Sequence, residues 1–310
     1  MKASVHSGPA IPVVLFAYAR PDLLARTLAC LRENEVPRII AFSDGPRAEE
    51  QSQAVDKVRR MLRAVEWCEL ELHERESNLG LGRSILSGMG EVFGRHDAAI
   101  VFEDDLVSVP GAYAYMSAAM RAYRDDARVF SVTGWTHPRV RPAGVGDAPY
   151  FDGRFASWSW GSWARVWRRM DRPASELVAA CRERGIDPGR YGHDLVEIAG
   201  VERERNVWAV RFACVHILDG GLCLHPPWSL VEHMGWGPDA TNVTPEAAWS
   251  NAPLQPCPNV PAVWPDVAER PECPALWQRA FPAPPPPPPT WRRWAGALKR
   301  RFARLVAPHG

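Results

Sequence analysis

The sequence lacks an excess of charge of either sign and lacks any long apolar run. Its 310 residues include 37 Lys and Arg against 36 Asp and Glu, a formal net charge of +1. A balanced chain has no overall field to attract nucleic acid, so we expect no nucleic-acid partner. No run approaches the roughly 20 apolar residues that a membrane-spanning helix needs. The first residues, "MKASVHSGPAIPVVLFAYARP", show no signal-peptide pattern, so we expect a cytoplasmic protein.

Paired cysteines are also missing. The seven cysteines are scattered, odd in number and form no Cys-X-X-Cys pair. This pattern argues against a zinc site and a disulfide framework, and we expect free thiols in a reducing compartment. There is no internal repeat. A chain that is 46% hydrophobic and 24% charged has an ordinary globular composition, and its length suits one large domain or two closely packed subdomains.

Strand-like and helix-like segments alternate over the first 135 residues. Continuous apolar runs predict strands buried on both faces, and one alternating run predicts a half-exposed strand. Segments with apolar residues at helical spacing lie between these runs. The alternation predicts an α/β fold with a mostly parallel sheet flanked by helices. The predicted strands are 12–18, 38–45, 67–73 and 98–102.

The second half of the chain is less regular, and prolines accumulate near its end. We expect the run "PAPPPPPP" and the residues before it to form an extended spacer of polyproline II type rather than a folded unit. The predicted organisation is a ligand-binding half at 1–135, a less regular half of the same domain at 136–251, a Pro-rich extended segment at 252–289, and a basic amphipathic helix at 290–310.

Three adjacent carboxylates end the fourth predicted strand. Glu103, Asp104 and Asp105 follow the apolar run in "DAAIVFEDDLVSVPGAYAYM". Ligands of open α/β sheets bind beyond the carboxyl ends of the strands. Adjacent carboxylates repel one another, and a divalent cation that prefers oxygen ligands, Mg²⁺ or Mn²⁺, is the simplest way to stabilise them. Such a metal can hold a diphosphate; a solvated acidic turn is the alternative interpretation.

The motifs resemble one known family. The stretches "VVLFAYARPDLLARTLACL", "FSDGPR", "GLGRSILSGMGEVF", "AAIVFEDDLVSVPGAYAYM", "VFSVTGW" and "WSWGSWARVW" resemble nucleotide-sugar glycosyltransferases of the GT-A fold. Within them, the similarity is to the inverting N-acetylglucosaminyltransferases that act on N-glycans and to bacterial sugar-transferase or hemolysin-like relatives. The resemblance implies metal-assisted transfer, with inversion, of a hexosyl or N-acetylhexosaminyl group. The donor would be a nucleotide-diphosphate sugar, above all a UDP-sugar, and the acceptor a hydroxyl of a glycan or lipid-linked saccharide.

The resemblance also implies roles for five residues on the donor side. Asp105 matches the acid that coordinates the metal, Asp104 the acid near the donor ribose, and Glu103 the acid that contacts the transferred sugar. Asp44, in "SDG", matches the acid that contacts the base, and Arg20 matches a basic residue near the donor phosphates. Asp44 also suits a turn cap, and Arg20 also suits a surface ion pair, so these alternatives stay open.

Two further positions and a tryptophan cluster complete the implied donor site. Arg83 lies where this branch of the family has a basic residue in the helix under the donor. His233, in "SLVEHMGWGPDATN", lies in a loop that resembles the one closing over the donor, where it would reach the metal or diphosphate; a packing role is the alternative. In "FASWSWGSWARVW" three tryptophans share one side at helical spacing. We expect one or two of the cluster to line the site and the rest to pack beneath it.

The general base is not matched. In the family a carboxylate just after a Trp takes the proton of the acceptor hydroxyl. The matching stretch "NVWAVRF" has Ala209 and Val210 at that place. We take Asp194, in "YGHDLVE", as the predicted base. The other carboxylates that remain open for this role are Asp219, Glu232 and Asp239.

Two other classes of protein compete with this interpretation. A sugar-nucleotide pyrophosphorylase would carry a Gly-rich loop directly after the first strand, and "FAYARPD" has none. A catalytically inactive sugar-binding or adhesive protein on the same scaffold would explain the missing acid, but the intact triplet speaks against it.

The last residues predict a helix that lies in a membrane interface. In "TWRRWAGALKRRFARLV" (290–306), aromatic and aliphatic residues recur on one face and six basic residues occupy the other side. Without these six the chain has 31 basic and 36 acidic residues, a formal charge of −5. We expect reversible binding to an anionic inner-face membrane, with the prolines as a semi-rigid spacer. Docking on the protein's own acidic body, or on a partner, is the alternative.

Overall fold

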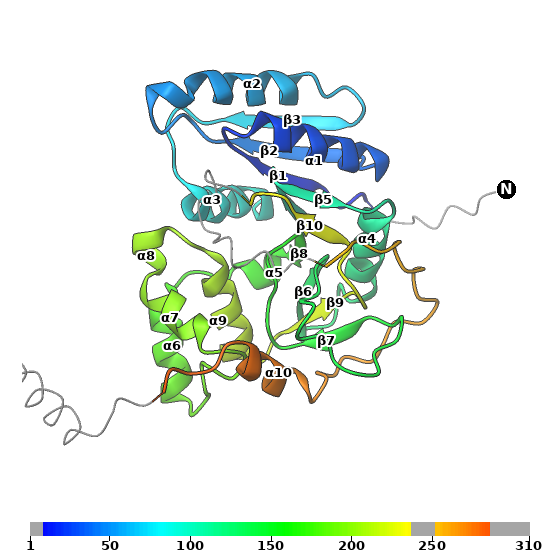
Figure 1. Cartoon of the computed structure of the whole chain (residues 1–310), viewed down its shortest axis with the longest axis vertical. Helices are drawn as coiled ribbons and strands as arrows, with labels where there is room; N and C mark the ends of the chain where they lie inside the picture. The colour runs from blue at the N-terminus through cyan, green and yellow to red at the C-terminus, as the bar shows by residue number, and fades with distance from the viewer. Residues whose placement is uncertain (1–8, 237–251, 286–310) are drawn as a thin grey trace, which may run out of the picture.

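A single sheet forms the centre of the molecule (Figure 1). The computed structural model describes residues 9–236 and 252–285. The sheet has eight strands in the order β3-β2-β1-β4-β8-β6-β9-β7, and the first four pair in parallel. This confirms the predicted α/β class with a mostly parallel sheet flanked by helices. The strands are β1 Val13–Ala17, β2 Arg38–Ser43, β3 Glu69–Glu74, β4 Ala98–Glu103, β6 Val129–Thr133, β7 Tyr150–Asp152, β8 Trp160–Trp163 and β9 Leu222–His225, and a separate pair is β5 Leu106–Ser108 with β10 Val231–His233.

Helices cover both faces of the sheet. The right-handed crossovers of a parallel sheet place α1 and α2 on one face of the first strands and α3 on the other. Gly88 of α3 lies against the rings of Phe16 and Phe42, so the helix packs closely on β1 and β2. The helices are α1 Pro21–Glu33, η1 Glu49–Gln51, α2 Ser52–Arg63, α3 Leu81–Phe93, α4 Ala112–Ala122, α5 Ala164–Trp167, α6 Ala174–Glu183, α7 Asp194–Gly200, α8 Glu202–Arg205, α9 Ala209–Asp219 and α10 Cys273–Ala280.

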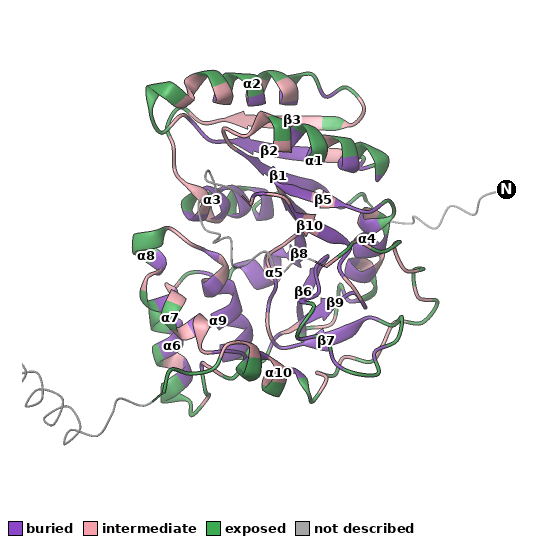
Figure 2. Ribbon diagram, viewed as in Figure 1, coloured by how far each residue is buried: buried purple, intermediate pink, exposed green. Residues whose placement is uncertain are grey.

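The central strands are buried along their length, as their apolar runs predict (Figure 2). All five residues of β1 are buried, because helices shield both of its faces. The register pairs Ala17 with Ser43 and Phe16 with Glu103. The residues that follow β1, β2 and β4 therefore meet at one edge of the sheet, which is where the predicted ligand site lies.

The tryptophan cluster does not form one helix. Trp160 and Trp163 belong to strand β8, and Trp167 belongs to the short helix α5. The predicted helical spacing is therefore wrong for the first two. All three are buried, as expected for most of the cluster. The sequence misleads here because Gly161 and Ser162 interrupt the apolar run of β8, and its tryptophans recur at a spacing of three residues that imitates a helix.

The Pro-rich segment is not simply an extended spacer. Residues 273–280 form α10, which packs on the second half of the sheet. The Trp277 side chain is 2% exposed, and its indole N–H donates to Asp152 at 2.8 Å. The interpretation of 252–289 as wholly extended is therefore wrong for this helix. A local excess of proline hid one apolar anchor whose partners lie more than a hundred residues earlier in the chain.

All seven cysteines are free thiols, as the sequence predicts. Within residues 9–236 and 252–285, none of the helices has the length and apolar character that crossing a membrane requires.

The buried imidazole of His216 generates the first prediction. Its Nδ1 lies 2.8 Å from the Phe212 carbonyl oxygen and its Nε2 lies 2.9 Å from the Ser131 hydroxyl, so the neutral ring is fully bonded. Burial lowers its pKa to about 4. Between the unfolded pKa and this value, the unfolded chain binds a proton that the folded chain does not. We therefore expect the contribution of His216 to the free energy of unfolding to fall by up to about 3 kcal/mol as pH drops from 7 to 4.

Urea unfolding of the whole chain at several pH values measures this loss. His216→Gln is expected to flatten the pH dependence, whatever its effect on stability at pH 7. His193→Gln, which changes a partly exposed histidine, is the matched control and should keep the slope of the parent. An equal slope in all three proteins would contradict the prediction.

Candidate functional site

A cavity of about 810 Å³ opens at the carboxyl edge of the sheet. One wall comes from residues that follow β1, β2 and β4, and the opposite wall comes from the second half of the chain. The strand order explains the first wall, because neighbouring parallel strands deliver their following residues to the same place. The polar and aromatic residues that line it include Tyr18, Arg20, Asp44, Gln51, Glu103, Asp104, Asp105, Trp158, Trp208 and His233.

Arg20 joins two of the three carboxylates. Its guanidinium lies 2.6 Å from Asp105 Oδ2 and also contacts Asp104 Oδ1. The two carboxylates are only 3% and 1% exposed, so this pair of charge-assisted bonds replaces the water they have lost. The structure thus brings together Arg20, Asp104 and Asp105 as the resemblance implied. The alternative surface pair is excluded for Arg20, whose guanidinium faces the site.

The acids differ in how their charges are stabilised. Burial raises the pKa of Glu103 well above its usual range, and the nearby Asp105 and Asp104 add to the shift. Burial likewise raises the pKa of Asp104 to about 6, although Arg20 opposes this. Burial acts in the same sense on Asp105, but a hydrogen bond from His233 and the charge of Arg20 leave its pKa below the usual value. Asp105 is therefore the acid most strongly held in its charged form.

The small ladder formed by β5 and β10 brings His233 to the acids. Residue 233 pairs with Leu106, the residue after the triplet, so the imidazole arrives beside Asp105. Its Nε2 lies 3.2 Å from Asp105 Oδ2, and the Met234 N–H donates to the Asp105 carbonyl at 2.8 Å. The ring also stacks on Trp158, with centroids 5.0 Å apart. Trp158 is thus a member of the tryptophan cluster that lines the cavity, as expected for one or two of them.

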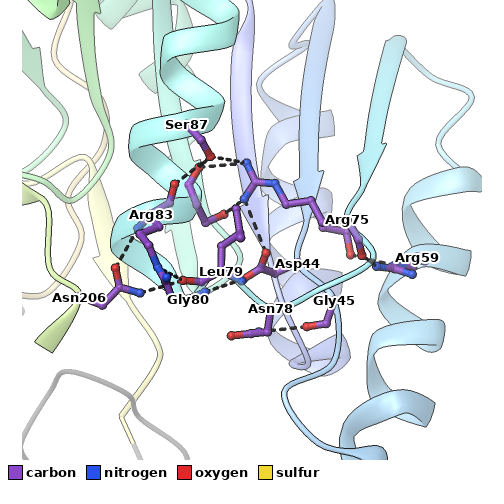
Figure 3. A network of polar contacts seen from close by, with 12 residues as sticks. Asp44, Gly45, Arg59, Arg75, Asn78, Leu79, Gly80, Arg83, Ser87 and Asn206 are labelled. Carbon is purple, nitrogen blue, oxygen red and sulfur yellow. Dashed lines mark hydrogen bonds and ion pairs between the residues drawn. The ribbon is translucent and has the colours of Figure 1, made fainter. Parts of the chain in front are cut away.

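Asp44 lines the same cavity from the end of β2, inside a network of polar contacts (Figure 3). Its Oδ2 accepts the N–H groups of Leu79 and Gly80, both at 2.9 Å. Its Oδ1 lies 3.6 Å from the Arg75 guanidinium. Burial raises the pKa of Asp44 above its usual value, while these N–H groups and Arg75 act against the shift. One oxygen therefore organises the loop before α3, and the other is left near the cavity with a longer ionic contact.

Arg83 does not reach this cavity. Its Nε donates to the Leu79 carbonyl at 3.0 Å, and the side chain lines a neighbouring cavity of about 840 Å³. The two cavities share four lining residues, among them Asn78 and Val207, so they adjoin one another. Arg83 therefore lies beside the loop before α3, in the adjoining cavity, and the implied position under a donor stays a prediction.

The predicted base is also remote from the cavity. Asp194 accepts two hydrogen bonds from Arg154, at 2.9 and 2.6 Å, and Arg154 in turn lies 4.2 Å above the ring centre of Trp277. Both carboxylate oxygens of Asp194 thus hold the second half of the chain to α10. The geometry gives no support to a role in proton transfer. Trp208 and Ala209 do line the cavity, so the position that matches the family's acid is in place but carries a methyl group.

Two of the other candidate carboxylates, Asp219 and Glu232, lie outside the lining of the cavity. Asp219 pairs with Arg169 at 2.6 Å and with Arg184 at 3.8 Å. Glu232 lies on β10, opposite Val107. Asp239 lies outside the residues that the structure describes.

Three residues that were not predicted from the sequence also shape the site. Tyr18 lines the cavity, and its backbone N–H donates to Asp104 Oδ2 at 2.7 Å. Arg75 bonds to Ser84 and Ser87 of α3 and lies beside Asp44, and Asn206 bonds to the first turn of the same helix. Tyr18 was detectable, since it directly follows β1. Arg75 and Asn206 act across long sequence separations, and no local pattern indicates them.

The residues around Asp105 suit a divalent cation that is only partly held by protein. Asp105 Oδ1 is buried and has no hydrogen-bond partner among the described residues. A carboxylate and an imidazole are ligands that Mn²⁺ accepts, and Mg²⁺ is commonly held by one or two carboxylates together with substrate phosphates. Arg20 already shares the charge of these acids, so the protein offers few ligands of its own. Asp105 and His233 are the residues that fit.

A second cluster of potential ligands lies elsewhere. In the described part of the chain, Glu71, His73 and Glu91 offer ligand atoms within 4.8 Å of one another. The Arg95 guanidinium lies 2.6 Å from Glu71, and its hydrogen bond is the main reason that the pKa of Glu71 is lowered to about 2. Arg38 adds a second ion pair with Glu71 at 3.2 Å. Arginines therefore already compensate the acids of this cluster.

Comparisons with known proteins give matches to solved structures alone. No protein-family model and no curated protein sequence matches the chain. A mannosyltransferase from Pyrobaculum calidifontis, solved with GDP-mannose and Mn²⁺, is similar at 15% identity, with 75% of this chain and 59% of that chain covered and a TM-score of 0.46. GalNAc-T7, solved with UDP, GalNAc and Mn²⁺, has 12% identity, 76% and 45% coverage and a TM-score of 0.45.

The first 349 residues of TarS from S. aureus are similar at 11% identity, with 73% of this chain and 61% of that chain covered and a TM-score of 0.40. The chain thus spans between 45% and 61% of the length of these solved structures. They include glycosyltransferases, the class that the sequence resembles. At TM-scores below 0.5 the likeness is loose, so the activity must be argued from the residues of the site.

The ion pairs of Arg20 generate the second prediction. Arg20→Gln leaves two buried carboxylates without their cation, which is expected to cost about 3 kcal/mol of the free energy of unfolding. Urea unfolding at pH 7.5, without added metal, measures the loss. Arg26→Gln, which changes an exposed residue of α1, the helix that follows Arg20, is the matched control and should stay within about 0.5 kcal/mol of the parent. Equal losses in the two variants would show that Arg20 does not stabilise the acids.

Proposed function

We propose that the protein is a glycosyltransferase that moves a sugar from a nucleotide-diphosphate donor, a UDP-sugar first of all, to a hydroxyl of a glycan or lipid-linked acceptor. The observation that carries the proposal is the pairing of Arg20 with Asp104 and Asp105 in a cavity that Asp44 also lines. This arrangement offers a cation and a metal-binding acid for a diphosphate. It also offers a buried acceptor for an N–H group of the nucleobase.

Each residue then has a chemical task. Asp44 Oδ1 is available to accept a hydrogen bond from the nucleobase, and Asp44 Oδ2 keeps the loop before α3 in place. Arg20 is positioned to bind phosphate oxygens as it turns from the acids toward the ligand. Glu103, partly exposed in the cavity and with its pKa raised, can share a proton with hydroxyls of the transferred sugar. Trp158, the half-buried member of the tryptophan cluster, lines the cavity, and the aromatic surface that its stacking on His233 leaves open suits the apolar side of a sugar ring.

Asp105 and His233 would hold the metal, Mn²⁺ or Mg²⁺. When bound, a divalent cation offsets the negative charge that develops on the diphosphate as it leaves. The chain contributes the rest by orientation and by excluding water. The two carboxylates are almost wholly buried, and stacking against Trp158 fixes the ring of His233. The proposal includes inversion at the anomeric carbon by a single displacement, as the family resemblance implies.

The third prediction concerns Asp105. Asp105→Ala is expected to reduce Mn²⁺-dependent binding of UDP at least tenfold and to abolish turnover of UDP-sugars, because the least protonated acid of the triplet is lost. Calorimetry with UDP and Mn²⁺, and release of UDP from a panel of UDP-sugars with and without Mn²⁺, measure the two effects. Asp22→Ala, an exposed acid of α1, is the matched control and should behave as the parent.

Three outcomes would contradict separate parts of the proposal. Unchanged UDP affinity and turnover in Asp105→Ala would remove this residue from the metal role. Donor binding without turnover in the parent, whatever the acceptor or metal, would favour an inactive sugar-binding protein. Where a product forms, NMR of its linkage decides the stereochemistry, since an α-linked product from an α-linked donor would reject inversion.

Binding of a membrane surface through residues 290–306 is part of the proposal. This segment lies outside the described residues, so its sequence alone supports the proposal. The spacing predicts a helix with aromatic and aliphatic residues on one side and six basic residues on the other. Each basic residue near an anionic leaflet contributes about 1 kcal/mol at moderate salt. A protein held at the inner face in this way would be close to a lipid-linked acceptor.

The fourth prediction tests this segment. The full chain is expected to sediment with anionic vesicles at low salt, whereas a chain truncated at residue 283 should stay in the supernatant. This truncation keeps α10, which ends at Ala280, so the body is left intact. Neutral vesicles control for charge, and replacing Trp291 and Trp294 by Ser controls for the apolar face. If full and truncated chains stay equally in solution with anionic vesicles, the membrane interpretation is wrong.

A further inference from the structure

Asn206 connects the second half of the chain to helix α3 and to the loop Asn78–Gly80 before it. It lies between α8 and α9 in the left-handed region, with φ 50°, which is uncommon for a residue other than glycine. Its side-chain Oδ1 accepts the Arg83 N–H at 3.0 Å, and its Nδ2 donates to the Leu79 carbonyl at 2.9 Å. Its own carbonyl accepts the Gly82 N–H at 2.9 Å. Figure 3 shows the side chain against the start of α3.

Two of these bonds cap α3 from a distant part of the chain, and the third holds the loop before it. The first N–H groups of a helix have no partner within the helix. The residue at the start of α3, Gly80, has no side chain that could cap it. Asn206 supplies the acceptors for Gly82 and Arg83, more than 120 residues away along the chain. The fit is close, because a Cβ at Gly80 would collide with Asn206 Nδ2 and a Cβ at Gly82 would collide with the Asn206 carbonyl. The glycines of "NLGLG" therefore make room for this one residue.

The same loop carries the partners of Asp44. Leu79 offers its carbonyl to Asn206 and its N–H to Asp44, and Gly80 offers the second N–H to Asp44. On the other side, Asn78 Nδ2 donates to the Gly45 carbonyl at 3.0 Å. The position of the Asp44 carboxylate is thus set by a loop that Asn206 holds. The residues that follow Asn206, Val207 to Ala209, line the cavity opposite.

We propose that Asn206 is a positioning residue for the nucleotide: it fixes the loop Asn78–Gly80 and the first turn of α3 against the second half of the chain, so that Asp44 and the wall at Val207–Ala209 lie at a set distance on either side of the ligand. The inference rests on the proposed function, since it assigns the end of the cavity at Asp44 to a nucleoside diphosphate. Asn206 contacts the loop and acts through it, without touching the ligand.

Two variants separate this role from simple stabilisation. Asn206→Gly keeps the left-handed backbone and the bond from Gly82 but removes both side-chain bonds. Asn206→Asp keeps the acceptor for Arg83 and places a negative charge at a helix N-terminus, which favours the helix, but it sets an oxygen against the Leu79 carbonyl. Glu35→Gly is the matched control, because Glu35 also has a positive φ, 51°, and lies away from the cavity.

Two measurements are made on each full-length protein. Calorimetry with UDP and Mn²⁺ is expected to show about tenfold weaker binding for both Asn206 variants and no change for Glu35→Gly. Hydrogen exchange of the ligand-free proteins should be about tenfold faster in peptides covering 79–84 for the Asn206 variants alone. The melting temperature of Asn206→Asp should stay close to that of the parent, so that its loss of binding is not a loss of folding.

The outcomes distinguish the inference from the function on which it rests. If the parent binds neither UDP nor GDP in the presence of Mn²⁺, the proposed function fails, and the nucleotide role of Asn206 fails with it. If the parent binds UDP and the Asn206 variants bind it equally well, the inference alone is overturned. Faster exchange without weaker binding would make Asn206 a structural cap and would also overturn the positioning role.

Discussion

The compensation of two buried carboxylates by one guanidinium is the constraint on which the site depends. Asp104 and Asp105 are almost wholly buried, and a lone buried charge is strongly unfavourable. Arg20 can supply the opposite charge because it follows β1, and β1 is the parallel neighbour of β4, which carries the acids. The strand order thus places a cation where the triplet needs one. It also leaves Asp105 Oδ1 without a hydrogen bond from any described residue, and this is the oxygen that the proposed cation would use.

The second half of the chain completes the site through contacts at long range. The ladder of β5 and β10 starts directly after the triplet and brings His233 beside Asp105, while Trp158 stacks on the imidazole. Asn206 bonds to the first turn of α3 and to the loop before it. The first wall therefore consists of residues that simply follow strands, whereas the second wall is placed by one short ladder and by single side chains. The geometry of the second wall depends on each of those contacts.

This difference explains what the sequence could predict. The strands β1, β2 and β4 are continuous apolar runs, and their parallel order brings Arg20, Asp44 and the triplet to one edge, so this half of the fold and site follows from local pattern. Strand β8 was hidden because Gly161 and Ser162 interrupt its apolar run and leave Trp160 and Trp163 at a helix-like spacing. The anchoring role of Asp194 was hidden because its partner Arg154 lies 40 residues away in sequence and is itself covered by Trp277. Contacts of that kind leave no periodic signal.

The wall at Trp208 and Ala209 shows what the long-range contacts imply for chemistry. The position that carries an acid in the family the sequence resembles does face the cavity, but it bears a methyl group. Its neighbours are fixed, since Asn206 bonds to α3 and Glu202 pairs with Arg211 at 2.7 Å at the start of α9. The backbone at this wall is therefore held in place, but residue 209 presents only a methyl group. If the protein is the transferase proposed above, the proton of the acceptor hydroxyl has to pass to a group other than this side chain.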